Sequence, residues 1–395
     1  MFYMRNKLSL SLLVTLLFIF VFNNVKSQNN KAKIEETIFV FGGDINQKFV
    51  QYVTDLTNKE NPKIYYLPTA SADNPENIKY WERICEKTGI EPLVLKVWVS
   101  SSASNKSFEE VLLNADAIVV GGGNTLNMLG IWKVQGIDTL LYKALRKGII
   151  FAGGSAGSIC WFQNGISDSR PVSLSMVNGL GYLPYSNCPH YSDEARKELY
   201  HKLIKDKKIH SGYACDDLAG VLFKNGKAVE FVSQSDKHNS YLVKMEKGAV
   251  QSKKMESKIL LKKGALSKND YTSLSVKKKI NNLLESEDQR TPLNAFIYTI
   301  KKIRLSKEGL SESERNKVLN ITIEQIFIYN NKLAGVVNNA YEDYYGLWYF
   351  YNCNGIWQSV GEDIGGETLI ESEITFREKA KIMIERAEKQ FTYNK

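Results

Sequence analysis

Apolar runs of strand length alternate with segments of helical spacing between residues 35 and 160. The apolar runs are Thr37–Phe41, Lys63–Leu67, Pro92–Val97, Ala117–Val120 and Gly148–Ala152. The segments with helical spacing are Asn46–Leu56, Asn77–Lys87, Phe108–Leu113 and Thr139–Arg146. Strands that are apolar on both faces and alternate with helices form parallel sheets covered by helices. The pattern therefore predicts an α/β domain built on a parallel sheet flanked by helices.

Glycine-rich or small polar stretches follow several of these runs. They are Gly42-Gly43-Asp44, Pro68-Thr69-Ala70-Ser71, Gly121-Gly122-Gly123-Asn124-Thr125 and Gly153-Gly154-Ser155. In open α/β sheets the ligand site lies at the carboxyl ends of the strands. These stretches are therefore expected to meet at one functional edge. The glycine run at 121–123 lacks both the G-K-[ST] of a phosphate loop and a G-x-G-x-x-G pattern, so no cofactor is predicted.

The most informative of these stretches is centred on Ser155. Gly153, Ser155 and Gly157 match G-x-S-x-G, and an apolar run enters the motif while a helix-compatible run leaves it. This is the strand–turn–helix context of a nucleophile elbow, where small residues allow the backbone to turn sharply beside a substrate carbonyl. The alternative interpretation is a glycine-rich turn whose serine caps a helix.

A serine nucleophile needs a histidine base and a carboxylate that orients that base. Of the four histidines, His190 is the best candidate, because it lies in a loop after an apolar stretch. His201 falls within a lysine-rich helical segment and is expected to be solvated. Candidate acids are Asp168, Asp216 and Asp217. No histidine pattern indicates a metal site.

Several of these motifs together resemble the peptidase E (aspartyl dipeptidase) and cyanophycinase-like serine peptidases. The resemblance is carried by Val119–Thr125, Gly153–Ser158 and Cys188-Pro189-His190-Tyr191, with support from Phe41-Gly42-Gly43 and Leu67–Ser71. It covers about residues 35–235, and it implies a fold like that of class I glutamine amidotransferases. The order of the motifs makes it far more specific than a lone G-x-S-x-G.

The resemblance also assigns roles to residues. It implies that Ser155 is the nucleophile, His190 the base and Asp168 the third member of the triad. A later glutamate is also a candidate acid in such enzymes. Here that region carries Asp216 and Asp217 instead, which departs from the family pattern, and Asp217 is the second choice. By the same resemblance, the oxyanion hole would be formed by the backbone N–H groups of Gly122, Gly123 and Ala156.

The family tends to accept aspartate on the acyl side of the bond, and such a pocket needs a cation. Arg170 and Arg196 are the candidates, although either could be a surface residue. The expected partner is a peptide substrate. Two alternatives remain open at this stage. One is a catalytically inactive extracytoplasmic binding protein on the same scaffold, and the other is an esterase or amidase that uses the same acyl chemistry.

Charge gives little support for a nucleic-acid partner. The formal net charge is +9, but the lysines are spread along the chain without an interleaved basic and aromatic pattern. The sequence also leaves the oligomeric state open, and a homodimer is compatible with it.

The N-terminus has the pattern of a signal peptide. Arg5 and Lys7 precede an apolar stretch, Leu8–Phe22, and small residues follow at Val25 and Ser27. This pattern predicts cleavage near residue 27 and export of the mature chain, periplasmic or secreted. A membrane association is expected only if the segment stays uncleaved.

The composition changes after residue 235. Residues 236–282 are rich in lysine and serine and are expected to be a linker or a solvated surface segment. Residues 283–395 contain a helical segment, strand-like runs, an Asn354-Gly355 turn and a charged terminal helix, which predicts a separate α+β domain of unknown role. Trp348 and Trp357 could line a groove there or belong to its core.

Overall fold

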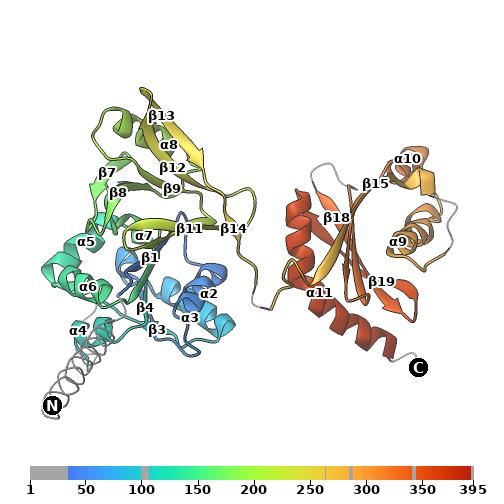
Figure 1. Cartoon of the computed structure of the whole chain (residues 1–395), viewed down its shortest axis with the longest axis horizontal. Helices are drawn as coiled ribbons and strands as arrows, with labels where there is room; N and C mark the ends of the chain where they lie inside the picture. The colour runs from blue at the N-terminus through green and yellow to red at the C-terminus, as the bar shows by residue number, and fades with distance from the viewer. Residues whose placement is uncertain (1–33, 99–105, 263, 284–287, 340–343, 393–395) are drawn as a thin grey trace, which may run out of the picture. The chain divides into compact units, whose positions relative to one another are not determined.

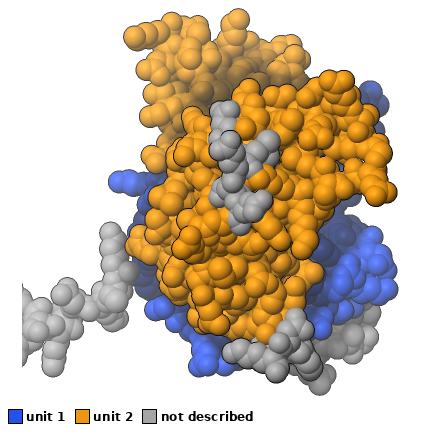
Figure 2. Space-filling model, turned by 90° about the vertical axis from the view of Figure 1, so that its right-hand side faces the viewer, with its two compact units in different colours: residues 1–40, 56–186, 222–229 blue, residues 41–55, 187–221, 230–395 orange. Residues whose placement is uncertain are grey.

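The computed structural model describes residues 34–98, 106–262, 264–283, 288–339 and 344–392. The chain divides into two compact units, which Figure 2 shows in different colours. The first consists of residues 1–40, 56–186 and 222–229, and the second of residues 41–55, 187–221 and 230–395. The predicted signal peptide, residues 1–27, lies outside the described residues. Among the described residues, no helix combines the length and the apolar character needed to cross a bilayer.

The first unit holds most of an eight-stranded sheet. Seven of its strands lie in the order β11-β10-β1-β5-β4-β2-β3, and the eighth, β14 (Lys258–Ile259), pairs with β11. The seven are β1 (Thr37–Phe41), β2 (Ile64–Leu67), β3 (Leu93–Val94), β4 (Ala117–Val120), β5 (Ile150–Gly154), β10 (Ala219–Lys224) and β11 (Lys227–Ser233). The β2–β3, β2–β4 and β4–β5 pairs are parallel, and every residue of β1, β4 and β5 is buried. Burial along whole strands requires cover on both faces, as the sequence predicts.

The helices of the first unit connect these strands. They are α3 (Pro75–Thr88), α4 (Phe108–Leu113), α5 (Thr125–Val134), α6 (Ile137–Arg146) and the single turn α7 (Ala156–Ile159). The α/β architecture with flanking helices is confirmed. Helix α5 was not predicted, because Gly130 lies inside it and Val134 leaves an apolar side chain exposed at its end. The predicted strand Pro92–Val97 is longer than β3. Beyond β3, the Asp73 carboxylate accepts the backbone N–H groups of Val97 and Trp98.

A six-stranded sheet has the order β13-β12-β9-β8-β6-β7. In the first unit, β6 (Phe162–Ser167) pairs with β7 (Ser175–Asn178), and β8 (Leu183–Cys188) follows in sequence. In the second unit, β9 (Gly212–Cys215) pairs with β12 (Ser240–Glu246), which pairs with β13 (Ala249–Lys254). The helices α2 (Gln47–Leu56) and α8 (Glu194–Lys205) also belong to the second unit, apart from the last residue of α2.

The strands β12 and β13 correct the expectation of a linker at residues 236–282. The same segment supplies β14 (Lys258–Ile259), which pairs in parallel with β11, and β15 (Tyr271–Lys279). Lysine and serine are frequent here because β13 and β15 expose most of their side chains to water. Backbone pairing stabilises these strands, and side-chain composition alone does not reveal such pairing. The alternative expectation, a solvated surface, matches this exposure.

The C-terminal part of the second unit is an antiparallel five-stranded sheet, as Figure 1 shows. Its strands are β15, β16 (Thr322–Tyr329), β17 (Leu333–Asn338), β18 (Tyr345–Cys353) and β19 (Ile356–Gly366). The helices α9 (Pro292–Ile300) and α10 (Glu312–Leu319) lie on one side of the sheet, and α11 (Leu369–Thr392) lies on the other (Figure 1). The predicted α+β composition of this region is present.

Side chains of β18 alternate between two hydrophobic cores. Trp348 and Phe350 pack with Phe296 of α9, whereas Leu347 and Tyr349 pack with Phe376 of α11. This alternation follows from the two-residue period of a strand whose two faces are both covered. Trp348 and Trp357 are each only 4% exposed, so they belong to a core and do not line an open groove.

Candidate active site

Ser155 occupies a strained turn between β5 and α7. Its backbone has φ 51° and ψ −116°, a conformation that L-residues rarely adopt. The N–H groups of Ser158 and Ile159 donate to the Ser155 carbonyl at 3.0 and 3.1 Å, which closes the first turn of α7. Strain of this kind persists where the surrounding structure determines the conformation, and it is frequent at functional sites.

The glycines of the motif are needed because backbone groups approach them closely. A Cβ added to Gly153 would lie 2.2 Å from the carbonyl oxygen of Gly157, and a Cβ added to Gly157 would lie 2.2 Å from the carbonyl oxygen of Val120. No side chain fits at either position without movement of the backbone. The second contact places the start of α7 against the end of β4, directly before the Gly121–Gly123 turn.

The Gly121–Gly123 turn is also held by close backbone contacts. Gly123 has φ 134°, and a Cβ there would lie 2.3 Å from the Ala70 carbonyl oxygen. The next residue, Asn124, donates its backbone N–H to the same carbonyl at 2.8 Å and caps α5 with its side chain. The first unit thus brings the Ser155 turn and the predicted oxyanion residues to the carboxyl ends of adjacent strands, β5 and β4.

The loop that carries Asp168 is tied to the N-terminus of α5. The Asn124 side-chain amide donates to the Ser169 carbonyl at 3.0 Å, and the hydroxyls of Thr125 and Ser167 lie 3.3 Å apart. Ser167 and Ser169 share a further hydroxyl contact of 2.7 Å. Asp168 itself lies between these two serines with an exposed side chain.

Arg170 contacts the neighbouring strand β7. Its Nη1 donates to the Ser175 hydroxyl at 2.9 Å and to the Met176 carbonyl at 3.0 Å, and the residue is exposed. These contacts favour the interpretation of Arg170 as a residue that braces the β6–β7 hairpin.

In the second unit, His190 follows β8 and contacts Asp217. The His190 Nδ1 and Asp217 Oδ1 atoms are 2.5 Å apart, although 27 residues separate the two in sequence. His190 also has a φ of 51°, a positive value that residues other than glycine rarely adopt. The N–H of Asp193 donates to the His190 carbonyl at 2.9 Å, and the N–H of Tyr191 donates to the Cys215 carbonyl at 3.0 Å. The histidine is therefore held through both its ring and its backbone.

The Gly42-Gly43 turn supports the segment that carries Asp217. The N–H of Gly43 donates to the Asp217 carbonyl at 3.0 Å, and the N–H of Gly42 donates to the Ala219 carbonyl at 3.1 Å. A Cβ at Gly42 would lie 2.3 Å from the carbonyl oxygens of Asp216 and Cys215. These glycines therefore allow β1 to end directly against the acidic loop.

Asp216, the neighbour of Asp217 in sequence, is only 5% exposed. Its Oδ2 accepts the backbone N–H of Asn239 at 2.8 Å, and burial raises the pKa of its carboxyl. Asp217, by contrast, keeps half of its side chain in solvent. The two adjacent aspartates thus have different environments, and Asp217 is the one that contacts the His190 ring.

Arg196 is buried in the first turns of α8, with 8% of its surface exposed. Its backbone N–H is capped by the Asp193 carboxylate at 3.2 Å. A buried guanidinium is uncommon on a helix of otherwise exposed charges. Of the two predicted substrate cations, Arg196 is therefore the one in a sheltered environment.

Comparison with known proteins places this geometry in a family. The family model described as "Peptidase family S51" matches residues 38–231. The protein named "Uncharacterized peptidase YgaJ" of Bacillus subtilis is 39% identical over 196 residues, which cover 49% of this chain and 84% of that protein. The chain belongs to peptidase family S51. It is a serine peptidase, and it acts on peptide substrates.

Two further matches are more distant. A protein named "Peptidase E" from Streptomyces coelicolor is 29% identical over 106 residues, which cover 24% of this chain and 44% of that protein. A crystal structure of a peptidase from an acI-B1 actinobacterium aligns with a TM-score of 0.46 at 15% identity, and covers 57% of this chain and 96% of that one. The family model ends at residue 231, so the C-terminal sheet of this S51 peptidase lies beyond the matched region.

Tyr191, the residue after His190, belongs to a polar cluster that was not predicted from the sequence. His201 was expected to be solvated, but its Nε2 lies 2.7 Å from the Tyr191 hydroxyl. Ser252 of β13 completes the cluster, with its hydroxyl 2.6 Å from that of Tyr191 and 3.0 Å from His201 Nε2. No local pattern could reveal Ser252, since it belongs to the lysine-rich segment that was expected to be a linker.

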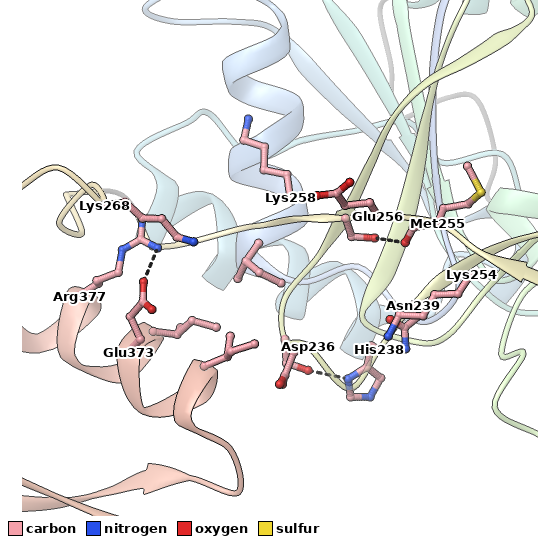
Figure 3. Close-up of a pocket in the computed structure, with 15 residues that line it drawn as sticks. Asp236, His238, Asn239, Lys254, Met255, Glu256, Lys258, Lys268, Glu373 and Arg377 are labelled. Atoms are coloured by element: carbon pink, nitrogen blue, oxygen red, sulfur yellow. Dashed lines mark hydrogen bonds and ion pairs between the residues drawn. The ribbon is translucent and has the colours of Figure 1, made fainter. Parts of the chain in front are cut away.

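A cavity of about 590 Å³ opens in the second unit of this peptidase, as Figure 3 shows. Its walls come from the β11–β12 connection, the end of β13 and the first turns of α11. Cationic and anionic side chains both line it, and they include Lys254, Lys258, Lys268, Arg377, Asp236, Glu256 and Glu373. None of the predicted catalytic, oxyanion or substrate residues lines this cavity, and its mixed charges select no ligand class.

Proposed function

We propose that this peptidase cleaves peptide bonds through an acyl-enzyme, with Ser155 as nucleophile, His190 as base and Asp217 as the residue that orients the base. The observation that carries the proposal is the contact between His190 Nδ1 and Asp217 Oδ1. A carboxylate on Nδ1 fixes the imidazole tautomer in which Nε2 accepts the proton of the nucleophile. The strained turn at Ser155 supplies the matching nucleophile.

We prefer Asp217 to Asp168 as the third member of the catalytic triad. Asp168 was the first choice on resemblance, and its role in catalysis stays a prediction. The preference for Asp217 rests on its contact with the His190 ring and on the glycine turn that supports its loop. An acid that orients a base has to reach one ring nitrogen directly, and Asp217 does so.

The reaction then proceeds in two halves. The Ser155 Oγ attacks the carbonyl carbon while its proton passes to His190 Nε2, and the carbonyl oxygen becomes an oxyanion. Backbone N–H groups of Gly122, Gly123 and Ala156 are proposed to stabilise that oxyanion. The C–N bond breaks and the leaving amine takes the proton from His190. Water then attacks the acyl ester while His190 takes its proton. The acid is released as His190 gives that proton to Ser155 Oγ.

We propose short peptides with an acyl-side aspartate as substrates. This follows from the resemblance to peptidase E and from the need of such a side chain for a cation. Arg196 is the preferred cation, because it is buried, whereas Arg170 is exposed and braces the β6–β7 hairpin. The expected effect of Arg196→Gln is a raised KM for Asp-X dipeptides, with little change for peptides that carry a neutral residue in that position.

The decisive experiment compares the purified protein with its Ser155→Ala variant. Both are assayed on Asp-X dipeptides, β-aspartyl dipeptides, neutral dipeptides and aryl esters. We expect Asp-X hydrolysis by the parent chain and a loss of about 10³-fold or more in the variant. Equal hydrolysis by both proteins would contradict the role of Ser155. Cleavage of esters without cleavage of peptides would favour the esterase alternative, and no turnover of any substrate would favour a binding protein.

We further propose that the mature protein is exported, on the basis of the charged start and the apolar stretch within residues 1–27. N-terminal sequencing of the protein from its native host tests this. A mature terminus near Gln28 is expected. An intact Met1 in the isolated protein would contradict cleavage.

A further inference from the structure

We propose that the cluster of Tyr191, His201 and Ser252 positions the catalytic base His190. This inference rests on the proposed function, because it concerns the base of that mechanism. None of the three residues is given a role in the reaction itself. They are positioning residues that act through the backbone of the His190 loop.

The cluster is compact. The Tyr191 hydroxyl lies 2.7 Å from His201 Nε2 and 2.6 Å from the Ser252 hydroxyl, and the remaining pair is separated by 3.0 Å. Both contacts of the Tyr191 hydroxyl are hydrogen bonds when Tyr191 donates to a neutral His201 and Ser252 donates to Tyr191. Burial raises the pKa of Tyr191 to about 12, so its hydroxyl remains a donor throughout the neutral range.

Tyr191 links this cluster to the base. It follows His190 directly in the chain, is 3% exposed, and donates its N–H to the Cys215 carbonyl. Its ring packs against that of Tyr241, with centroids 4.9 Å apart, and meets Tyr200 edge to face. A residue fixed at its ring, its hydroxyl and its N–H leaves the preceding residue little freedom of rotation.

His190 needs such a restraint. Its φ of 51° is a conformation that is unfavourable for a residue other than glycine. The contact with Asp217 fixes the ring but does not fix the backbone that presents the ring. Tyr191 anchors that backbone to the following helix α8 through His201 and to the distant strand β13 through Ser252, so two elements hold one strained turn.

The charges around His201 are compatible with a neutral ring. Lys197 and Glu194 lie on the same helix, and Tyr191 and Ser252 face the ring from the His190 loop and from β13. Burial, followed by the charge of Lys197, lowers the pKa of His201. A neutral His201 can accept a hydrogen bond from the Tyr191 hydroxyl. The base His190 has to be neutral in the same pH range.

The test removes the hydroxyl and keeps the ring. Tyr191→Phe is compared with Tyr349→Phe, a matched control in the C-terminal core, where the buried hydroxyl has no hydrogen-bond partner among the described residues. We expect Tyr191→Phe to lower kcat about tenfold with KM unchanged, since misplacement of a catalytic group costs rate more than binding. Tyr349→Phe should leave both constants unchanged. An unchanged kcat in Tyr191→Phe, or a raised KM alone, would overturn the proposal.

Ser252 provides a second, milder variant on an exposed strand, where folding is not at risk. Ser252→Ala should lower kcat in the same direction as Tyr191→Phe, and Ser252→Thr should restore it, because threonine keeps the hydroxyl. The Tyr191→Phe/Ser252→Ala double variant should be no slower than Tyr191→Phe alone, since the two hydroxyls act as one unit. Additive losses would contradict a shared role.

A spectroscopic readout separates this inference from the proposed function. The His190 Nδ1 proton in the bond to Asp217 should give a downfield proton resonance, assigned by its loss in His190→Gln. We expect Tyr191→Phe to broaden or shift that resonance, and Tyr349→Phe to leave it in place. Retained activity in Ser155→Ala would contradict the proposed mechanism. The resonance in Tyr191→Phe would still show whether Tyr191 positions His190. An unchanged resonance in Tyr191→Phe would refute the positioning role.

Discussion

Ser155 and His190 have the same unusual backbone angle, a φ of 51°, but different parts of the chain hold it. At Ser155 the supports lie close by in sequence or on the adjacent strand. The Gly153 and Gly157 backbones meet each other, the end of β4 meets Gly157, and α7 begins at the next residue. At His190 the supports come from Asp217, Cys215, His201 and Ser252.

The difference teaches how each turn can fail. The Ser155 turn depends on the absence of side chains, so it is broken by adding atoms. The His190 turn depends on hydrogen bonds from distant residues, so it is broken by removing atoms. Substitutions at the two turns and at the buried carboxyl beside Asp217 therefore test this contrast.

The largest effect is expected at the acid. Asp217→Asn should lower kcat by about 10³- to 10⁴-fold, because the amide favours the wrong imidazole tautomer while the shape is kept. Asp168→Asn should lower kcat by less than about tenfold if Asp217 is the orienting acid. Steady-state kinetics on one dipeptide measures both. A larger loss in Asp168→Asn than in Asp217→Asn would reverse the assignment and restore the choice made on resemblance.

An intermediate effect is expected at the Ser155 turn. Gly157→Ala places a Cβ 2.2 Å from the Val120 carbonyl oxygen, and should destabilise the fold by about 3 kcal/mol. The control is Gly130→Ala within α5, where a Cβ would meet nothing within 4 Å, and which should gain about 1 kcal/mol of stability. Urea denaturation of the two variants measures the difference. Equal midpoints would show that the close approach at Gly157 is not needed.

The smallest effect is expected at Asp216. Burial raises the pKa of its carboxyl, so the folded protein holds this proton more tightly than the unfolded chain does. The contribution of this carboxyl to the free energy of unfolding therefore falls as the pH rises from the ordinary pKa of aspartate through the raised pKa. At neutral pH the folded protein bears the full cost of burying the charge. Asp216→Asn keeps an acceptor for the Asn239 N–H and loses the charge.

Thermal melts across pH check this prediction. The midpoint of Asp216→Asn should exceed that of the parent chain by about 2–4 °C at pH 7, and the two should converge near pH 3. Convergence is expected because the parent carboxyl is then protonated in both the folded and the unfolded state. A lower midpoint for the variant at pH 7 would mean that the charge itself stabilises the fold.

The sequence by itself determined the α/β class, the boundaries of β1 and β4, and the turn at Ser155. These depend on periodicity and on small residues within a few positions of one another. The β10–β11 hairpin likewise turns at Asn225-Gly226, a dipeptide that favours such turns. His190 was selected from four histidines because it follows an apolar stretch and fits the family motif.

The contact between Asp217 and His190, the role of Gly42-Gly43 and the position of Ser252 on β13 became visible only in the folded chain. Asp168 and Asp217 are both loop aspartates, and nothing in their local sequence distinguishes the one that reaches the imidazole. Likewise, the exposed side chains of β13 carry no apolar signal, because its order comes from backbone pairing with β12. Contacts between residues far apart in sequence arise from the sheet order, and no local pattern of residues encodes them.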